Sequence, residues 1–106
     1  MPKYLLQVSY TAEGARGVVK DGGRKRREAA GALVESLGGT LEAFYFAFGS
    51  TDVFVIADLP DNVAAASASM TVGASGAASS TVTILITPEE IDRAAKMSPR
   101  YTPPGR

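Results

Sequence analysis

Asp52 and Tyr45 are the two side chains of this sequence that could act as a catalytic pair. Asp52 stands where an expected strand begins, and burial there would suit its carboxylate to act as a general base near neutral pH. Tyr45 would contribute a phenol from the preceding strand. An Asp at the end of a tight hairpin more often caps turn amides or pairs with a base, and we favour that structural interpretation of Asp52.

A binding interpretation places Tyr45 together with Gln7 and Ser9. A phenol, an amide and a hydroxyl among Leu and Ala side chains would suit a small apolar ligand with one polar end. The simpler alternative is that Tyr45 fills an interface and hydrogen-bonds a partner subunit, and we favour it slightly.

The basic run Arg24-Lys25-Arg26-Arg27 follows Lys20 and the pair Gly22-Gly23. Lys20 and Arg24 could bind an anion together with the glycine amides. Four consecutive bases also suggest a nucleic-acid patch, but successive helical residues point about 100° apart, so these bases spread around the helix. Residues 31–92 contain eight acids and no base, which argues against a broad phosphate track. We favour a solvated helix face and expect no nucleic-acid partner.

The absence of His and Cys removes whole classes of chemistry from this chain of 106 residues. It excludes a Ser-His-Asp triad, a thiol nucleophile, a Cys/His zinc site and haem ligation by His or Cys. We therefore expect no metal and no cofactor. No segment approaches the ~20 apolar residues of a membrane span, and none resembles a signal peptide. We expect a soluble cytoplasmic protein without a membrane partner.

Hydrophobic periodicity and capping residues divide the chain into alternating strands and helices. Leu41, Ala43 and Tyr45 should share one face of the second strand, and Val63, Ala66 and Met70 one stripe of the third helix. The expected elements are a strand over 3–10, a helix capped by Thr11 and running to 20, a break at 21–23, a helix capped by Asp21 over 24–37 and stopped by Gly38-Gly39, strands over 40–48 and 52–59, a helix capped by Asp61 or Asn62, a strand over 81–86, and a helix over 88–97 before an extended tail.

This order predicts an α+β fold: a ferredoxin-like βαββαβ antiparallel sheet with its helices on one face. The other face should include Leu5, Gln7, Ser9 and one face of the hairpin. These residues are too apolar to be left in water, so we infer that two subunits stack these faces across a twofold axis.

Several short motifs follow one another in an order that resembles a known family. They are Tyr10-Thr11 with Gly14, Lys20 and Arg24, Gly38-Gly39, Tyr45, Gly49 with Asp52, Pro60-Asp61, and the closing Tyr101-Thr102-Pro103-Pro104-Gly105. In these features the chain is similar to the GYD domain family, a small bacterial family of the dimeric α+β barrel group. The resemblance implies that fold in a homodimer, and it brings no established activity with it.

One departure from the family pattern lies in the motif Gly-x-Tyr-Asp, since this sequence reads Gly49-Ser50-Thr51-Asp52. Any role of the family tyrosine is therefore missing at Thr51. We assign residues 1–87 to the GYD-like domain and residues 88–106 to a C-terminal helix and Pro-rich tail.

The leading functional hypothesis is a homodimeric domain that binds a small molecule in a mostly apolar pocket at or near the space between the two sheets. The ligand would be apolar or anionic. The first alternative is a cofactor-independent oxygenase or isomerase of a small aromatic compound that uses Tyr45 and Asp52. The second is a structural module that assembles through its C-terminal helix and tail. The absence of His disfavours the enzyme, because proton transfer near pH 7 would need a shifted Asp, Glu or Lys.

Overall fold

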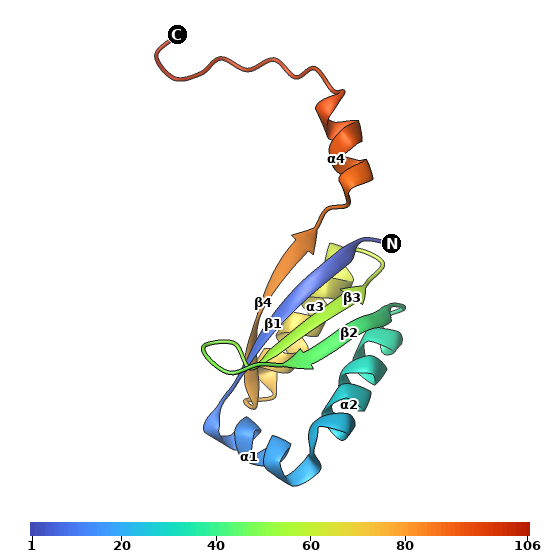
Figure 1. Cartoon of the computed structure of the whole chain (residues 1–106), viewed down its shortest axis with the longest axis vertical. Helices are drawn as coiled ribbons and strands as arrows, with labels where there is room; N and C mark the ends of the chain where they lie inside the picture. The colour runs from blue at the N-terminus through green and yellow to red at the C-terminus, as the bar shows by residue number, and fades with distance from the viewer.

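A single four-stranded antiparallel sheet carries two of the four helices on one of its faces (Figure 1). The computed structural model describes all residues 1–106. The strands lie in the order β2-β3-β1-β4, which is the ferredoxin-like arrangement and confirms the predicted fold class. The elements are β1 Lys3–Tyr10, α1 Ala12–Asp21, α2 Gly23–Ser36, β2 Thr40–Phe46, β3 Val53–Asp58, α3 Asn62–Ala74, β4 Ala78–Leu85 and α4 Pro88–Ala95.

Local signals determine where the first two helices begin and end. Thr11 Oγ1 accepts a hydrogen bond from the Gly14 amide at 3.1 Å, as expected of an N-cap. Gly22 has a φ of 84° and Gly38 a φ of 85°, a backbone conformation that glycine adopts at little cost. These two residues confirm the predicted break and stop. Asp21 was wrongly expected to cap α2, because it is the last residue of α1 and Gly22 occupies the N-cap position.

The last two helices begin at side-chain caps. Asp61 Oδ1 accepts from the Ala64 amide at 2.9 Å, so Asp61 is the cap of α3. At α4, Thr87 accepts from the Glu90 amide while Glu90 accepts from the Thr87 amide, and Pro88 opens the first turn. Hydrogen bonds to the Thr87 backbone and side chain lower the pKa of Glu90 below its ordinary value.

A β-bulge at Glu42 changes which residues of β2 face the helices. Leu41 pairs with Ala57 and Phe44 pairs with Val55, with the register shift between them. In a regular strand, residues three positions apart point to opposite faces. Because the bulge adds one residue to β2, Leu41 and Phe44 both lie on the helix side. The prediction that Leu41 shares a face with Ala43 and Tyr45 is therefore wrong. β2 also ends at Phe46, short of the expected residue 48.

Helix α3 packs on the sheet through small side chains. Ala65 and Ala68 are buried, whereas Val63 and Met70 are 77% and 73% exposed. The predicted apolar stripe through Val63, Ala66 and Met70 is therefore wrong. Short side chains let the helix approach β4 closely, and the Ser69 and Ser80 hydroxyls form a 2.9 Å hydrogen bond between the two elements.

The hydrophobic core lies between the sheet and the helices. Its largest buried side chain is Tyr4, whose hydroxyl donates to Asn62 Oδ1 at 2.7 Å and so ties β1 to the start of α3. The residues of this core are Tyr4, Leu6, Val34, Val53, Val55, Ala57, Leu59, Ala65 and Ala68.

No helix covers the other face of the sheet (Figure 1). At one end of this open face, Lys3 hydrogen-bonds Glu42 and, at 2.9 Å, Asp58. The bond to Glu42 and then that to Asp58 raise the pKa of Lys3 above its ordinary value. Leu5, Phe54 and Ile56 form an apolar patch at the centre of the open face, next to the polar residues Gln7, Thr81 and Thr83.

The C-terminal segment stands away from the sheet and its helices (Figure 1). None of the residues of α4 is buried, and Ile91 is 52% exposed. The helix ends at Ala95, slightly before the predicted residue 97, and the chain then extends to Arg106. None of the helices is long and apolar enough to cross a membrane.

Candidate functional site

An apolar cavity of about 340 Å³ lies between the sheet, α2 and α3. It exists because α2 packs mainly over β2 and α3 mainly over β4, at opposite edges of the sheet. The two central strands, β1 and β3, form the floor between them through Leu6 and Val55. The helices meet this space with small side chains such as Ala30 and Ala68, and hydrophobic residues account for 15 of the 18 lining positions.

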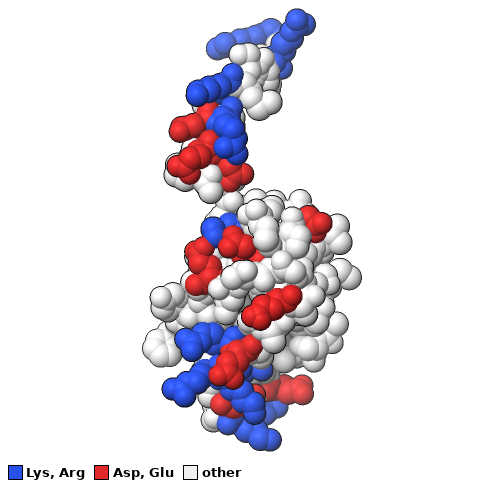
Figure 2. All heavy atoms as spheres, turned by 90° about the vertical axis from the view of Figure 1, so that its right-hand side faces the viewer, with Lys and Arg blue, Asp and Glu red and all other residues white.

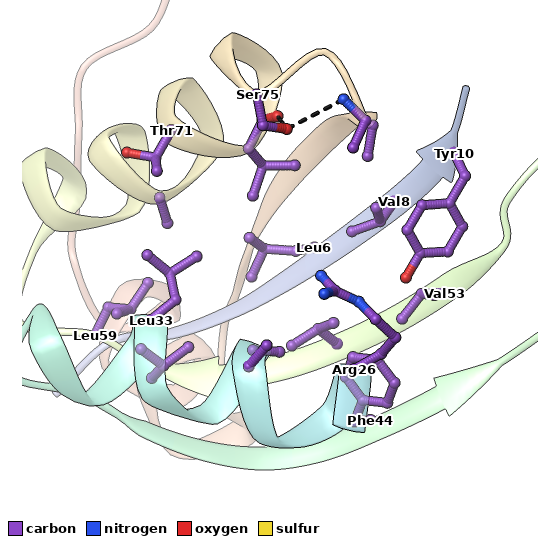
Figure 3. Close-up of a pocket in the computed structure, with 18 residues that line it drawn as sticks. Leu6, Val8, Tyr10, Arg26, Leu33, Phe44, Val53, Leu59, Thr71 and Ser75 are labelled. Atoms are coloured by element: carbon purple, nitrogen blue, oxygen red, sulfur yellow. Dashed lines mark hydrogen bonds between the residues drawn. The ribbon is translucent and has the colours of Figure 1, made fainter. Parts of the chain in front are cut away.

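The one charged group of the cavity and a phenol lie at the same end, whereas the hydroxyls of Thr71 and Ser75 line it from α3, with Thr71 toward the opposite end (Figure 3). Figure 3 shows the Arg26 guanidinium pointing from α2 into the space, with the Tyr10 ring at the same end and Leu33 and Leu59 at the other. The nearest acidic oxygen to Arg26 is Asp21 Oδ2, at 3.9 Å. This separation is too long for a hydrogen bond. Arg26 is the only charged side chain that lines the cavity.

Sequence reasoning did not single out Arg26, although a signal was present. Arg26, Ala29, Ala30 and Leu33 all line the cavity from α2, and their spacing of three and four residues is that of one helix face. The apolar residues Ala29, Ala30 and Leu33 recur at helical spacing in the sequence, and one turn before Ala29 and Ala30 this face reaches a base. Of the four consecutive bases, Arg26 alone lines the cavity, and a prediction for the run as a whole did not distinguish it from its neighbours.

The basic residues that were singled out lie elsewhere. Lys20 on α1 and Arg24 on α2 are exposed, and neither lines the cavity. Figure 2 shows the bases of α1 and α2 at one end of the molecule, interspersed with acids. Asp21 lies 3.9 Å from the Lys25 ammonium as well as from Arg26. An anion site formed by Lys20 and Arg24 stays a prediction.

Gln7, Ser9 and Tyr45 share the open face of the sheet, opposite the cavity. Phe54 pairs with Gln7 on one side and with Tyr45 on the other, so these three residues form a row across the face. Tyr45 is 71% exposed. Ser9 donates to the carbonyl of Ser50 at 2.7 Å. A pocket between two such faces stays a prediction; the cavity that one chain forms lies on the helix side.

Asp52 joins the β2–β3 loop to the end of β1. Its carboxylate accepts from the Tyr10 amide at 2.8 Å, and its own amide donates to the Val8 carbonyl at 2.8 Å. Asp52 therefore has a structural contact, but its partner is an amide at the end of β1 and not the turn amide or base that the sequence suggested. Asp52 also borders a second, more open hollow at this end of the sheet, of about 490 Å³ and lined by Phe46 and Phe48. No hydrogen bond joins Asp52 to Tyr45, and their use in catalysis stays a prediction.

Asp52→Ala should lower the free energy of unfolding by about 1–3 kcal/mol, because the part-buried Tyr10 amide loses its charged acceptor. Asp52→Asn should cost less than about 1 kcal/mol, since the side-chain carbonyl can still accept the bond. Urea unfolding followed by circular dichroism measures both. Equal losses in the two variants would show that the negative charge matters more than the acceptor.

The last findings concern metal binding and the similarity of the chain to known proteins. It contains no group of three or more His, Cys, Asp or Glu side chains that could hold a metal ion. A family model described as the GYD domain matches residues 4–95. No curated protein and no solved structure matches the chain.

Proposed function

This chain belongs to the GYD domain family, and on that premise we propose that it is a homodimeric protein that binds a small, mostly apolar molecule. The observation that carries the proposal is the cavity of about 340 Å³ between the sheet and helices α2 and α3. Its volume falls within the range of roughly 300–1,000 Å³ that ligand sites occupy, and it combines apolar walls with a few polar groups. The proposed site is therefore on the helix side of the sheet.

The open face supports the dimer. Leu5, Phe54 and Ile56 occupy its centre, and Phe54 is 37% exposed. Tyr45 adds an exposed aromatic ring beside them. A contiguous apolar face on a small protein marks an interface, and a second copy of the same face is self-complementary across a twofold axis. Stacking two sheets in this way leaves both cavities on the outside of the sheet pair, where a ligand can enter.

The C-terminal segment supports assembly beyond the dimer as a second candidate function. Helix α4 has no buried residue, and Tyr101 in the tail is 76% exposed. The bases from residue 93 onward could meet the acids of residues 31–92 on a neighbouring copy. Such contacts between exposed charges weaken as salt is added.

One experiment tests these proposals together. Light scattering at low salt and at about 1 M NaCl measures subunit number, and titration with the neutral fluorescent probe N-phenyl-1-naphthylamine measures binding. We expect a dimer that persists at high salt, any larger oligomer to dissociate, and saturation at one probe per chain. A monomer at micromolar concentration would overturn the dimer. Fluorescence that rises without saturation would overturn the binding function.

A further inference from the structure

We infer that the ligand of this cavity is an apolar carboxylate and that Arg26 binds its charged end. This inference rests on the proposed binding function and adds the chemical class of the ligand. It follows from the placement of one cation in an otherwise apolar space.

The Arg26 guanidinium has donors to spare. Its side chain is 38% exposed, and its nearest charge partner is the Asp21 carboxylate at 3.9 Å. A guanidinium presents five N–H donors in a planar fork that matches the two oxygens of a carboxylate. Because part of the side chain is removed from water, an anion inside the cavity would form stronger bonds with it than at an open surface.

Tyr10 adds a second polar group at the same end. Its ring lines the cavity near Arg26, on the side away from Leu33 and Leu59 (Figure 3). A phenol can donate to a carboxylate that Arg26 already holds. The two residues come from different elements, the end of β1 and the second turn of α2, and they define one polar end. The apolar part of the ligand would then lie along Leu6 and Leu33 toward Leu59.

Asp21 opposes the binding of an anion. It lies within 4 Å of Arg26 and, at 3.9 Å, of Lys25, so its negative charge lowers the positive potential at the mouth of the cavity. Removal of this charge should therefore favour a carboxylate ligand and have no effect on a neutral one. The prediction is opposite in sign to that for Arg26, which makes the pair of substitutions diagnostic.

The volume of the cavity indicates how large a test ligand should be. At ~30 Å³ for each group of the size of a water molecule, 340 Å³ holds on the order of ten non-hydrogen atoms. Octanoate and 1-octanol match this size and differ only at the polar end. Both can be measured through displacement of N-phenyl-1-naphthylamine from the full-length protein. This probe has more atoms, but its aromatic carbons carry at most one hydrogen each and pack more densely than aliphatic groups, so it occupies a similar volume.

We expect octanoate to displace the probe at a concentration roughly tenfold or more below that of 1-octanol. Arg26→Met should weaken the binding of octanoate by roughly tenfold to a hundredfold and leave the binding of 1-octanol unchanged, since Met keeps the apolar stem of the side chain. Arg26→Lys should give an intermediate loss. Asp21→Asn should strengthen the binding of octanoate and leave that of 1-octanol unchanged. The matched control is Arg27→Met, which removes an exposed base that does not line the cavity.

The outcomes separate the two levels of the proposal. Equal displacement by octanoate and 1-octanol, unaffected by Arg26→Met, would overturn the carboxylate inference and leave the binding function standing. Failure of both ligands and of the probe to bind would overturn the binding function itself. Thermal unfolding of each variant shows whether it is folded, and Arg26→Lys provides a charged variant if Arg26→Met is not.

Discussion

Gly14→Ala is expected to lower the free energy of unfolding by about 2–3 kcal/mol, because there is no room for a side chain at this position. A Cβ atom at Gly14 would lie 1.9 Å from the Ala77 carbonyl oxygen and 3.1 Å from Tyr10 Cδ1. The same carbonyl accepts the Thr11 amide at 2.9 Å. A methyl group would therefore push the start of α1 away from the turn before β4.

Gly17→Ala is the matched control, since it lies one turn further along the same helix. Nothing lies within 4 Å of a Cβ atom at Gly17, so the substitution should stabilise the protein by up to about 1 kcal/mol through helix propensity. Thermal and urea unfolding measure both changes. If Gly14→Ala also stabilises the protein, α1 does not dock against the turn at Ala77.

Ala30→Leu should weaken binding in the cavity and raise stability together, which is the second large effect. Ala30 lines the cavity from α2, and Leu adds three carbon atoms to that space. Burial of each carbon contributes about 0.8 kcal/mol, so stability should rise by up to about 2 kcal/mol. Because the larger side chain takes up part of the cavity, the affinity for N-phenyl-1-naphthylamine should fall by roughly tenfold or more, where about 1.4 kcal/mol corresponds to a factor of ten.

Ala32→Leu controls for the added hydrophobicity, because Ala32 lies on the same helix, is exposed and does not line the cavity. It should change neither probe affinity nor stability by more than about 0.5 kcal/mol. Fluorescence titration and thermal unfolding of both variants provide the comparison. Wild-type probe affinity in Ala30→Leu would place the probe elsewhere, with the open face of the sheet as the next candidate.

Features that depend on a few neighbouring residues were predictable from the sequence. Thr11 caps α1, Gly22 separates the two helices, and Asp61 caps α3. In each case the side chain, or its absence, acts on backbone groups within the same turn. The order of strands follows from these boundaries and from the handedness of the connections, which explains why the ferredoxin-like class was predicted correctly.

Features that depend on the fit between distant elements were not predictable. The bulge at Glu42 depends on how β2 aligns with β3, and no residue of β2 alone determines it. Helix α3 buries Ala65 and Ala68 and exposes Met70, because close approach to β4 outweighs the usual preference for burying large side chains. The cavity is the space left by two such packings, so periodicity along the chain could not reveal it.

The residues of the motif at 49–52 also have contacts that depend on a distant element, the strand β1. Gly49 has a φ of 128°, a conformation that suits a turn residue of the β2–β3 loop, and Asp52 accepts a hydrogen bond from the Tyr10 amide and so joins this loop to β1. Thr51 donates to Gln7 Oε1 at 3.3 Å. The glycine and the aspartate thus have structural roles that do not need the aromatic residue that is missing at position 51.

The proposed binding of a ligand in the apolar cavity would also link folding to the supply of that ligand. A native state that binds a molecule gains stability by mass action, about 2.7 kcal/mol when the free ligand reaches 100 times its Kd. The total free energy of unfolding of a folded domain is only about 5–15 kcal/mol, so this gain is a large share of it for a chain of 106 residues. The proposed occupant would act as a removable part of the hydrophobic core. The amount of folded protein in a cell would therefore follow the concentration of the ligand, even without catalysis.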